Sequence, residues 1–221
     1  MDAVKAIIFD LDNTLFNENE YFYAVHDEFA RRKNVDSLIL KNTYQRIKLE
    51  SEDIFGDILK HNGMYTPELQ EEYFSLYKRI DTHLSLYEDA FAIIEWLKCQ
   101  GHILGIITNG VLEAQKNKIR SLGIEDKFDT IIFAREFGKK YEKPSPKPFK
   151  YFLNKFNFLG KECIFVGDTY ETDIIGAKKV GMQTMLIQRD VSSSQFFFNE
   201  NKYIDYLGKD LYLLKKIVGC K

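Results

Sequence analysis

Five short apolar runs, separated by helix-like segments, are the feature that most restricts the fold of this chain. Each run is rich in β-branched or aromatic residues, and the five are Val4–Phe9, Ile103–Ile107, Thr130–Phe133, Cys163–Val166 and Thr184–Ile187. Continuous apolar runs of this kind are typical of parallel strands that are buried on both faces. The chain is therefore predicted to form an α/β fold around a parallel sheet of five or more strands.

Segments with helical spacing alternate with these runs. Helices are expected at Asp89–Cys99, Leu112–Leu122, Pro146–Phe156 and Asp173–Val180. Gly101, Gly123 and Gly181 follow three of them, at the position where a glycine commonly ends a helix. Strand and helix therefore alternate from about residue 85 onward.

The long stretch between the first and second strands is different, because residues 17–84 contain no convincing strand. Tyr21–Arg32, Ser37–Glu50 and Pro67–Ile80 carry apolar residues at three- and four-residue spacing, which is typical of helices. These segments are either surface helices packed on the sheet or a separate helical insertion over the end of the first strand. We favour the insertion, because one crossover connection does not use so many residues.

Composition excludes several classes of protein. Lys and Arg number 31 against 33 Asp and Glu, a net charge of −2, whereas nucleic acids and anionic membranes normally require a basic face. The three cysteines, Cys99, Cys163 and Cys220, form no CxxC pair and favour a reducing compartment. Asp10 and Asp12 interrupt the first apolar stretch, so no export signal is predicted, and no run reaches the roughly 20 apolar residues of a membrane helix. We expect a cytoplasmic protein, monomer or homodimer, without a nucleic-acid or membrane partner.

Polar residues follow three of the predicted strands. The motifs are Asp10-Leu11-Asp12-Asn13-Thr14-Leu15, Thr108-Asn109-Gly110, and Gly167-Asp168 with Asp173 five residues later. In open α/β sheets, ligands bind outside the carboxyl ends of the strands. Carboxylates gathered at that edge repel one another and need a cation, and their oxygen atoms suit Mg²⁺. No His or Cys lies near these motifs, which disfavours zinc.

Two further groups indicate an anionic substrate. Thr108 offers a hydroxyl group, and the backbone N–H groups of Asn109 and Gly110 are expected to form an anion nest. Lys143 begins the proline-rich stretch Lys143–Pro148, which is predicted to be a stiff approach to a helix starting near Pro146. A phosphate dianion is tolerated beside the carboxylates only if a metal, the lysine and fixed donors bind it together.

The ordered set of motifs resembles that of the haloacid dehalogenase (HAD) superfamily of phosphohydrolases. The matching segments are Asp10–Leu15 (the DxDxT motif), Thr108–Gly110, Lys143-Pro144 and Gly167–Asp173. The resemblance implies a Rossmann-like core made of residues 1–16 and 85–221, with residues 17–84 as a helical cap of the C1 subclass. The chain departs from the family pattern in having Thr172 where Asn is frequent and about two additional residues before Lys143.

The resemblance also implies a reaction. It implies Mg²⁺-dependent hydrolysis of a small phosphorylated metabolite, such as a nucleotide or a sugar phosphate, through an aspartyl-phosphate intermediate. Asp10 would be the nucleophile and Asp12 the general acid and base. The other implied roles are metal binding by Asp10, Asp12 (through its backbone carbonyl) and Asp168, support of the metal site by Asp173 and Thr14, and binding of phosphoryl oxygens by Thr108, Asn109 and Lys143.

Other activities require different catalytic groups. Dehalogenation requires no general acid for an alkoxide, so Asp12 favours phosphoryl transfer, whereas a phosphomutase would carry the same motifs and stays open. A non-enzymatic binding protein is disfavoured because Asp10, Asp12 and Lys143 are all present. Tyr21 and Phe22 are candidate substrate contacts of the insertion, although aromatic residues at helical spacing more often pack in a core. His26 is expected to be a surface or packing residue instead of a proton carrier.

Overall fold

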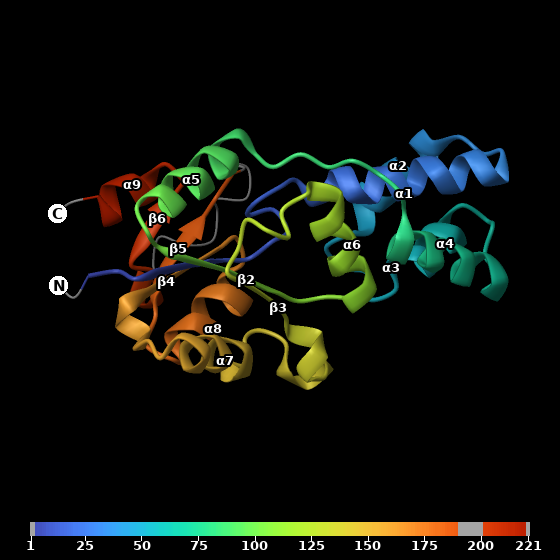
Figure 1. The fold of residues 1–221 in the computed structure, drawn as a ribbon. Helices are drawn as coiled ribbons and strands as arrows, with labels where there is room; N and C mark the ends of the chain where they lie inside the picture. Colours follow the sequence, from blue (N-terminus) through green and yellow to red (C-terminus); the bar gives the residue numbers. More distant parts are fainter. Residues whose placement is uncertain (1–2, 190–200, 220–221) are drawn as a thin grey trace.

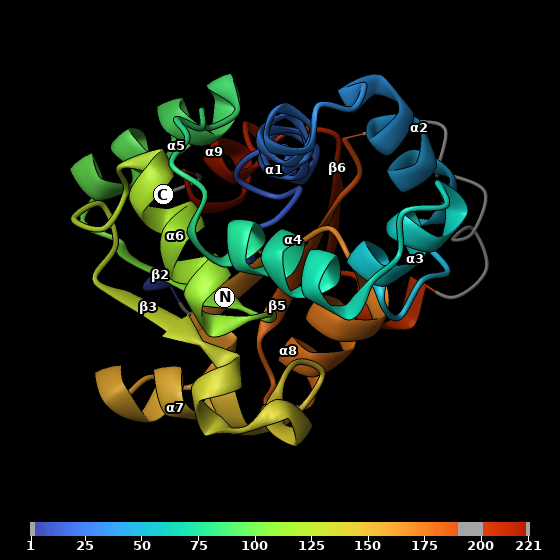
Figure 2. The same ribbon diagram turned by 90° about the vertical axis from the view of Figure 1, so that its right-hand side faces the viewer.

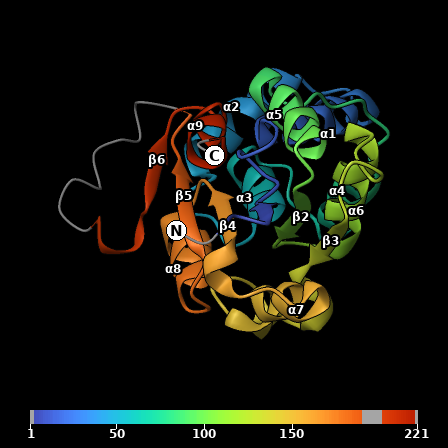
Figure 3. The same ribbon diagram turned by 60° about the vertical axis from the view of Figure 1, so that its left-hand side comes forward.

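A six-stranded parallel sheet lies at the centre of the protein, with the strand order β3-β2-β1-β4-β5-β6. The computed structural model describes residues 3–189 and 201–219, so Cys220 lies outside the described residues. The strands are β1 (Ala6–Phe9), β2 (Ile103–Thr108), β3 (Thr130–Phe133), β4 (Cys163–Gly167), β5 (Gln183–Ile187) and β6 (Tyr206–Gly208). Figure 3 shows the sheet from β6 at one edge to β3 at the other. The predicted α/β fold is confirmed.

Helices cover both faces of the sheet (Figure 1). One face carries α5 (Glu88–Cys99), α6 (Leu112–Leu122) and α9 (Leu213–Val218), and the other carries α7 (Pro146–Phe156) and α8 (Ile175–Lys178). Each face of the sheet has its own hydrophobic core, and strand β1 contributes to both. Ile7 and Phe9 pack on the first face, while Ala6 and Ile8 pack on the second. This explains why the strands are apolar throughout instead of alternating with polar residues.

Four helices fill the stretch between β1 and α5, and we call them the α1–α4 group. They are α1 (Glu18–Lys33), α2 (Ser37–Ile47), α3 (Ile54–His61) and α4 (Pro67–Arg79). Each starts at a side chain that accepts a hydrogen bond from the backbone of its first turn, and these N-cap residues are Asn17, Asp36, Asp53 and Thr66. The group lies at the end of the molecule opposite α9 and the start of β1, as Figure 1 shows, and in Figure 2 the molecule is seen from the side of this group. Its apolar residues join those of the α5 face in one continuous cluster.

Hydrogen bonds join the two connections between the sheet and the α1–α4 group. The backbone N–H of Tyr87 donates to the carbonyl of Leu15 at 2.9 Å. Arg189, just after β5, donates to the carbonyl of Thr14 at 2.7 Å and forms two hydrogen bonds with the Asp89 carboxylate, at 3.0 and 3.1 Å. One guanidinium group therefore holds the chain where it leaves the sheet and where it returns.

The structure differs from the predicted elements at four places. The helix expected at Asp173–Val180 is wrong in its first half, where a π-helical turn, η4 (Tyr170–Ile174), precedes the short α8. Helices α3 and α9 and strand β6 were not predicted. Short 3₁₀ turns complete the described chain: η1 (Ala134–Phe137), η2 (Lys139–Tyr141), η3 (Gly160–Glu162) and η6 (Asn201–Tyr203). Within residues 3–189 and 201–219, no helix has the length and apolar character needed to cross a lipid bilayer.

Candidate active site

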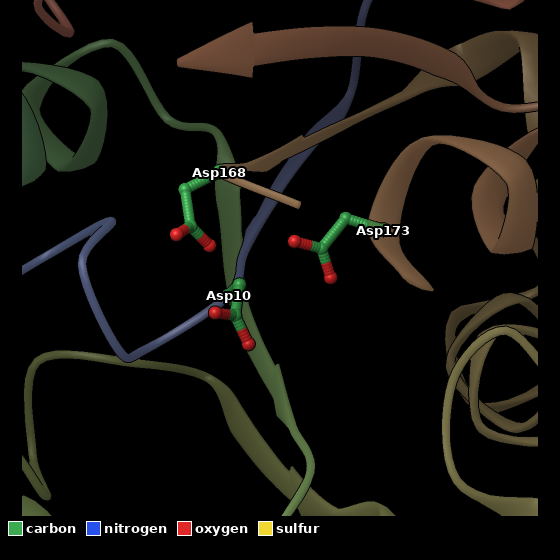
Figure 4. A group of neighbouring side chains, drawn as sticks. All are labelled: Asp10, Asp168 and Asp173. Carbon is green, nitrogen blue, oxygen red and sulfur yellow. The ribbon is translucent and has the colours of Figure 1, made fainter. Parts of the chain in front are cut away.

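Three carboxylates meet at the carboxyl end of the sheet. Asp10 follows β1, and its backbone N–H donates to the carbonyl of Val166 at 2.8 Å, which keeps it in line with β4. Asp168 follows β4, and Asp173 lies in η4. Each contributes a carboxylate oxygen to a cluster whose atoms all lie within 4.8 Å of one another, and Figure 4 shows the three side chains around a common space. Residues that are far apart in the sequence thus converge where the strand-end motifs predicted a site.

Lys143 is the cation of this cluster. Its side chain is buried, and Nζ lies 2.5 Å from Oδ1 of Asp10 and 2.7 Å from Oδ1 of Asp173. The side chain of Asn109 holds the backbone of Lys143 from both sides: Oδ1 accepts from its N–H at 2.8 Å, and Nδ2 donates to its carbonyl at 3.0 Å. The helix expected after this segment is confirmed, since α7 begins at Pro146 with Ser145 as its N-cap. Asn109 therefore positions Lys143 in addition to lying beside the site.

Burial and mutual repulsion dominate the electrostatics of the cluster. Burial raises the pKa of Asp10 well above its usual range, although Lys143 opposes the shift. Burial, reinforced by the charge of Asp173, raises the pKa of Asp168 to about 7. Burial alone would lower the pKa of Lys143, but the Asp10 and Asp173 carboxylates outweigh it and raise that pKa above its ordinary value. The ammonium group therefore stays charged, and the carboxylates have too little positive charge around them.

This donor set fits a hard divalent cation. Three carboxylates face one ammonium group, which leaves an excess of two negative charges when all are ionised. Every candidate ligand atom of the cluster is a carboxylate oxygen, the type that Mg²⁺ and Ca²⁺ bind, and the cluster includes no His or Cys. A small cavity of about 180 Å³ adjoins it, lined by Asp10, Asp12, Asn13, Glu18, Thr108, Asn109, Lys143, Asp168, Thr169 and Thr172. A cation and a small anionic group therefore have room beside the carboxylates.

The sequence around Asp173 explains how this carboxylate reaches the cluster. The side chain accepts a hydrogen bond from the backbone N–H of Thr169 at 3.1 Å, which closes the π-helical turn η4. A Cβ atom on Gly167 would lie only 2.3 Å from an oxygen of Asp173, so this close approach requires glycine. Wide helical turns are frequent at functional sites. The failure of the regular helix predicted here is thus a consequence of placing Asp173 beside Lys143.

Asp12 has different neighbours, and the sequence reasoning missed them. Its Oδ2 accepts from Nε2 of Gln115 at 2.8 Å, and its Oδ1 accepts from Nζ of Lys118 at 2.7 Å. Gln115 also donates to the hydroxyl of Thr108 at 2.6 Å, and Lys118 to a carboxylate oxygen of Glu18 at 2.9 Å. A signal was present in the sequence. Gln115 and Lys118 interrupt a stripe of α6 at 4-3-4 spacing, from Val111 to Leu122, that is otherwise apolar.

The expected anion nest after β2 is only partly available. The N–H of Gly110 donates to a carboxylate oxygen of Glu142 at 2.8 Å, and Glu142 is also paired with Arg135. In the described state this N–H therefore binds a carboxylate of the chain itself, and its binding of a substrate anion stays a prediction. Thr14 is fully buried, and its hydroxyl oxygen has no hydrogen-bond partner among the described residues.

The ring-bearing residues of α1 lie in different environments. Tyr21 is fully buried, and its hydroxyl donates to the carbonyl of Tyr77 at 2.5 Å, so it packs in the interior instead of lining a cavity by the site. Phe22 lines a cavity of about 260 Å³ that shares Asn13 and Glu18 with the site cavity. His26 is buried, and its Nδ1 lies 2.6 Å from the hydroxyl of Tyr73, so of the two expected roles it has the packing one and does not lie on the surface. Of the two candidate substrate contacts, Phe22 thus borders a cavity next to the site, whereas Tyr21 belongs to the interior.

Comparisons with known proteins agree with this geometry. The sequence model of the haloacid dehalogenase-like hydrolase family matches residues 7–187. A glyceraldehyde 3-phosphate phosphatase of Methanocaldococcus jannaschii is 31% identical over 231 residues, covering 97% of each chain. The crystal structure of a HAD phosphatase from Thermococcus onnurineus is 30% identical, with a TM-score of 0.65 over 97% of this chain and 98% of that one. The magnesium-bound HAD-hydrolase YfnB from Bacillus subtilis, 21% identical, has a TM-score of 0.72 over 99% of this chain and 100% of its own.

Proposed function

Because the chain belongs to the haloacid dehalogenase-like hydrolase family, we propose that it is a Mg²⁺-dependent phosphatase of small phosphorylated metabolites. The observation that carries the proposal is the convergence of Asp10, Asp168 and Asp173 on one buried lysine at the end of the sheet. The names of the relatives support the reaction class, since two of those compared above are phosphatases and one acts on a small phosphorylated aldehyde. In this proposal residues 1–16 and 85–221 are the catalytic core, and residues 17–84 are a cap that helps to select the substrate.

Side-chain oxygens of Asp10 and Asp168, with the backbone carbonyl of Asp12, would hold the cation, and Asp173 would support them. When bound, Mg²⁺ offsets the negative charge of these carboxylates and polarises a phosphoryl oxygen. Lys143 and the Thr108 hydroxyl would bind the other phosphoryl oxygens. Lys143 suits this task because it is held by its neighbours before substrate arrives, and preorganised donors stabilise developing charge without reorganising during the reaction.

In the first half-reaction a carboxylate oxygen of Asp10 attacks phosphorus, and the bond from phosphorus to the ester oxygen breaks. Asp12 gives a proton to the leaving alkoxide, which departs as an alcohol. In the second half-reaction Asp12 takes a proton from water, the hydroxide attacks the aspartyl-phosphate, and inorganic phosphate leaves with the Asp10 carboxylate restored. A general acid at Asp12 is the feature that favours phosphate esters over haloacids as substrates.

The test compares the wild type with Asp10→Asn, using the exposed Asp81→Asn as matched control. Release of inorganic phosphate from 4-nitrophenyl phosphate and glyceraldehyde 3-phosphate is measured with Mg²⁺ present. Asp10→Asn should lose about a thousandfold or more in kcat while unfolding at a similar temperature, and the control should stay at wild-type activity. Acid-quenched wild type should carry the mass of one phosphoryl group on the peptide containing Asp10. Substantial turnover by Asp10→Asn, or a phosphoryl group on another residue, contradicts the proposal.

A further inference from the structure

Lys118 of α6 has no exposed surface, whereas the other lysine of this helix, Lys116, is exposed to solvent. Lysine is almost never fully buried unless its charge is paired. Here Nζ donates to Asp12 at 2.7 Å and to Glu18, in the first turn of α1, at 2.9 Å. The aromatic rings that surround it, within 6.0 Å of Nζ, are those of Phe16, Tyr21 and Tyr77. The ammonium group is therefore held in position by side chains of the loop that follows β1, of α1 and of α4.

Gln115 lies one turn before Lys118 on the same face of α6 and completes the contacts of Asp12. It donates to Oδ2 of Asp12 at 2.8 Å, while Lys118 donates to Oδ1 at 2.7 Å. Residues three apart face the same side of a helix, so one rigid element supplies both donors. A carboxylate held through both oxygens has its rotamer and its plane fixed. The same Gln115 amide reaches the hydroxyl of Thr108 at 2.6 Å, so it connects two groups of the proposed site.

Neither donor borders the place where substrate would bind. Asp12, Glu18 and Thr108 line the site cavity, whereas Gln115 and Lys118 do not. Gln115 is nearly as buried as Lys118, at 1% and 0% exposure of the whole residue. These two residues can therefore act on the reaction only through the groups they hold.

We propose that Lys118 and Gln115 are positioning residues that aim the Asp12 carboxyl group at the oxygen it must protonate. The inference rests on the proposed function, because it assigns them a task in proton transfer by Asp12. It predicts an effect that depends on the leaving group. An alkoxide needs a proton in order to depart, whereas 4-nitrophenolate is stable enough to leave without one. A residue that only supports the fold would affect both kinds of ester alike.

The experiment uses Lys118→Met and Gln115→Met, with Lys116→Met as the matched control on the same helix. Lys116 is exposed and pairs with Glu136 at 3.1 Å, away from Asp12. The rate constant for release of the leaving group is measured in a single turnover, with enzyme in excess. The leaving group is 4-nitrophenolate for 4-nitrophenyl phosphate and glycerol for glycerol 1-phosphate. Single turnovers isolate the first half-reaction from the hydrolysis of the phosphoenzyme.

For each of the two variants we expect alcohol release from glycerol 1-phosphate to slow about 100-fold, and release from 4-nitrophenyl phosphate to slow by less than about fivefold. KM should stay within about twofold of wild type, because neither residue lines the cavity. Equal slowing of both esters, or no slowing of either, overturns the inference. Lys116→Met should match the wild type on both substrates.

Lys118→Met leaves two carboxylates without their shared cation, so its fold is checked by circular dichroism and thermal unfolding. If this variant does not fold, Gln115→Met decides alone, since it removes a neutral donor. A Gln115→Met enzyme without leaving-group selectivity then overturns the inference. Wild type that releases phosphate from neither ester contradicts the proposed function itself, whereas active wild type with unaffected variants contradicts only the positioning role.

Discussion

We expect acid to lower the free energy of unfolding of this protein through the imidazole of His26, a residue of α1 that is fully buried. Its Nδ1 lies 2.6 Å from the Tyr73 hydroxyl, and its Nε2 has no hydrogen-bond partner among the described residues. Burial lowers the pKa of His26 from 6.5 to about 3; Lys41 contributes in the same direction and Asp27 opposes it. Protonation would therefore place a charged, unpaired N–H among aromatic rings.

The sign and size of the effect follow from linkage. Because the folded pKa is lower than the unfolded one, the unfolded chain binds more protons between these two values, and stability falls as the pH drops below 6.5. Each pH unit in this interval corresponds to about 1.36 kcal/mol. At pH 4.5, about two units below the unfolded pKa, His26 should cost about 2.7 kcal/mol of unfolding free energy relative to pH 7.5.

The variant His26→Asn tests this, because the amide can still reach Tyr73 and does not titrate. His83→Asn, which removes an exposed imidazole, is the matched control. Urea unfolding of all three proteins is measured from pH 7.5 to pH 4.5. Over this range the wild type and the control should lose about 2.7 kcal/mol more than His26→Asn does. Parallel profiles for the wild type and His26→Asn, within about 0.5 kcal/mol, would refute the reasoning.

Three further outcomes follow from the site and the connections. EDTA should abolish phosphatase activity and added Mg²⁺ should restore it; a rate that is indifferent to metal contradicts the proposed chemistry. Gly167→Ala should lower kcat on the order of tenfold or more and stability by about 1–3 kcal/mol, because the new methyl group would displace Asp173; wild-type kinetics would refute this. Arg189→Met should lower the unfolding free energy by about 3 kcal/mol, because it leaves Asp89 without its cation, and an unchanged urea midpoint would contradict that role.

Five of the six strands were predictable because each is a short apolar run, and three of these runs end in a polar motif. The predicted and observed bounds of β3 are identical, and β2 and β4 each extend one residue further. Strand β6 was not predicted, since it has only three residues and its Leu207 is exposed. Helix α3 is a single eight-residue segment with Gly56 inside it, which weakens its helical signal.

The site was predictable only in part. The carboxyl ends of parallel strands meet at one edge, so the approach of Asp10 to Asp168 followed from topology. The partners of Asp12 did not follow, because a lysine on an amphipathic helix is ordinarily assigned to the exposed face, and Lys118 is instead enclosed. The π-helical turn that brings in Asp173 likewise depends on a contact with Lys143, 30 positions away, that forms only in the assembled fold.

The strand order has a consequence for synthesis on the ribosome. Strand β1 precedes the other strands along the chain, yet it lies between β2 and β4 and has both as hydrogen-bonding neighbours. A nascent chain therefore carries β1 unpaired until the distant segments emerge, and Lys143 joins Asp10 across 133 positions. Contacts so remote in sequence make folding slow and leave an apolar strand open to aggregation meanwhile. Chaperone demand should accordingly be greatest for translation intermediates that end before β4.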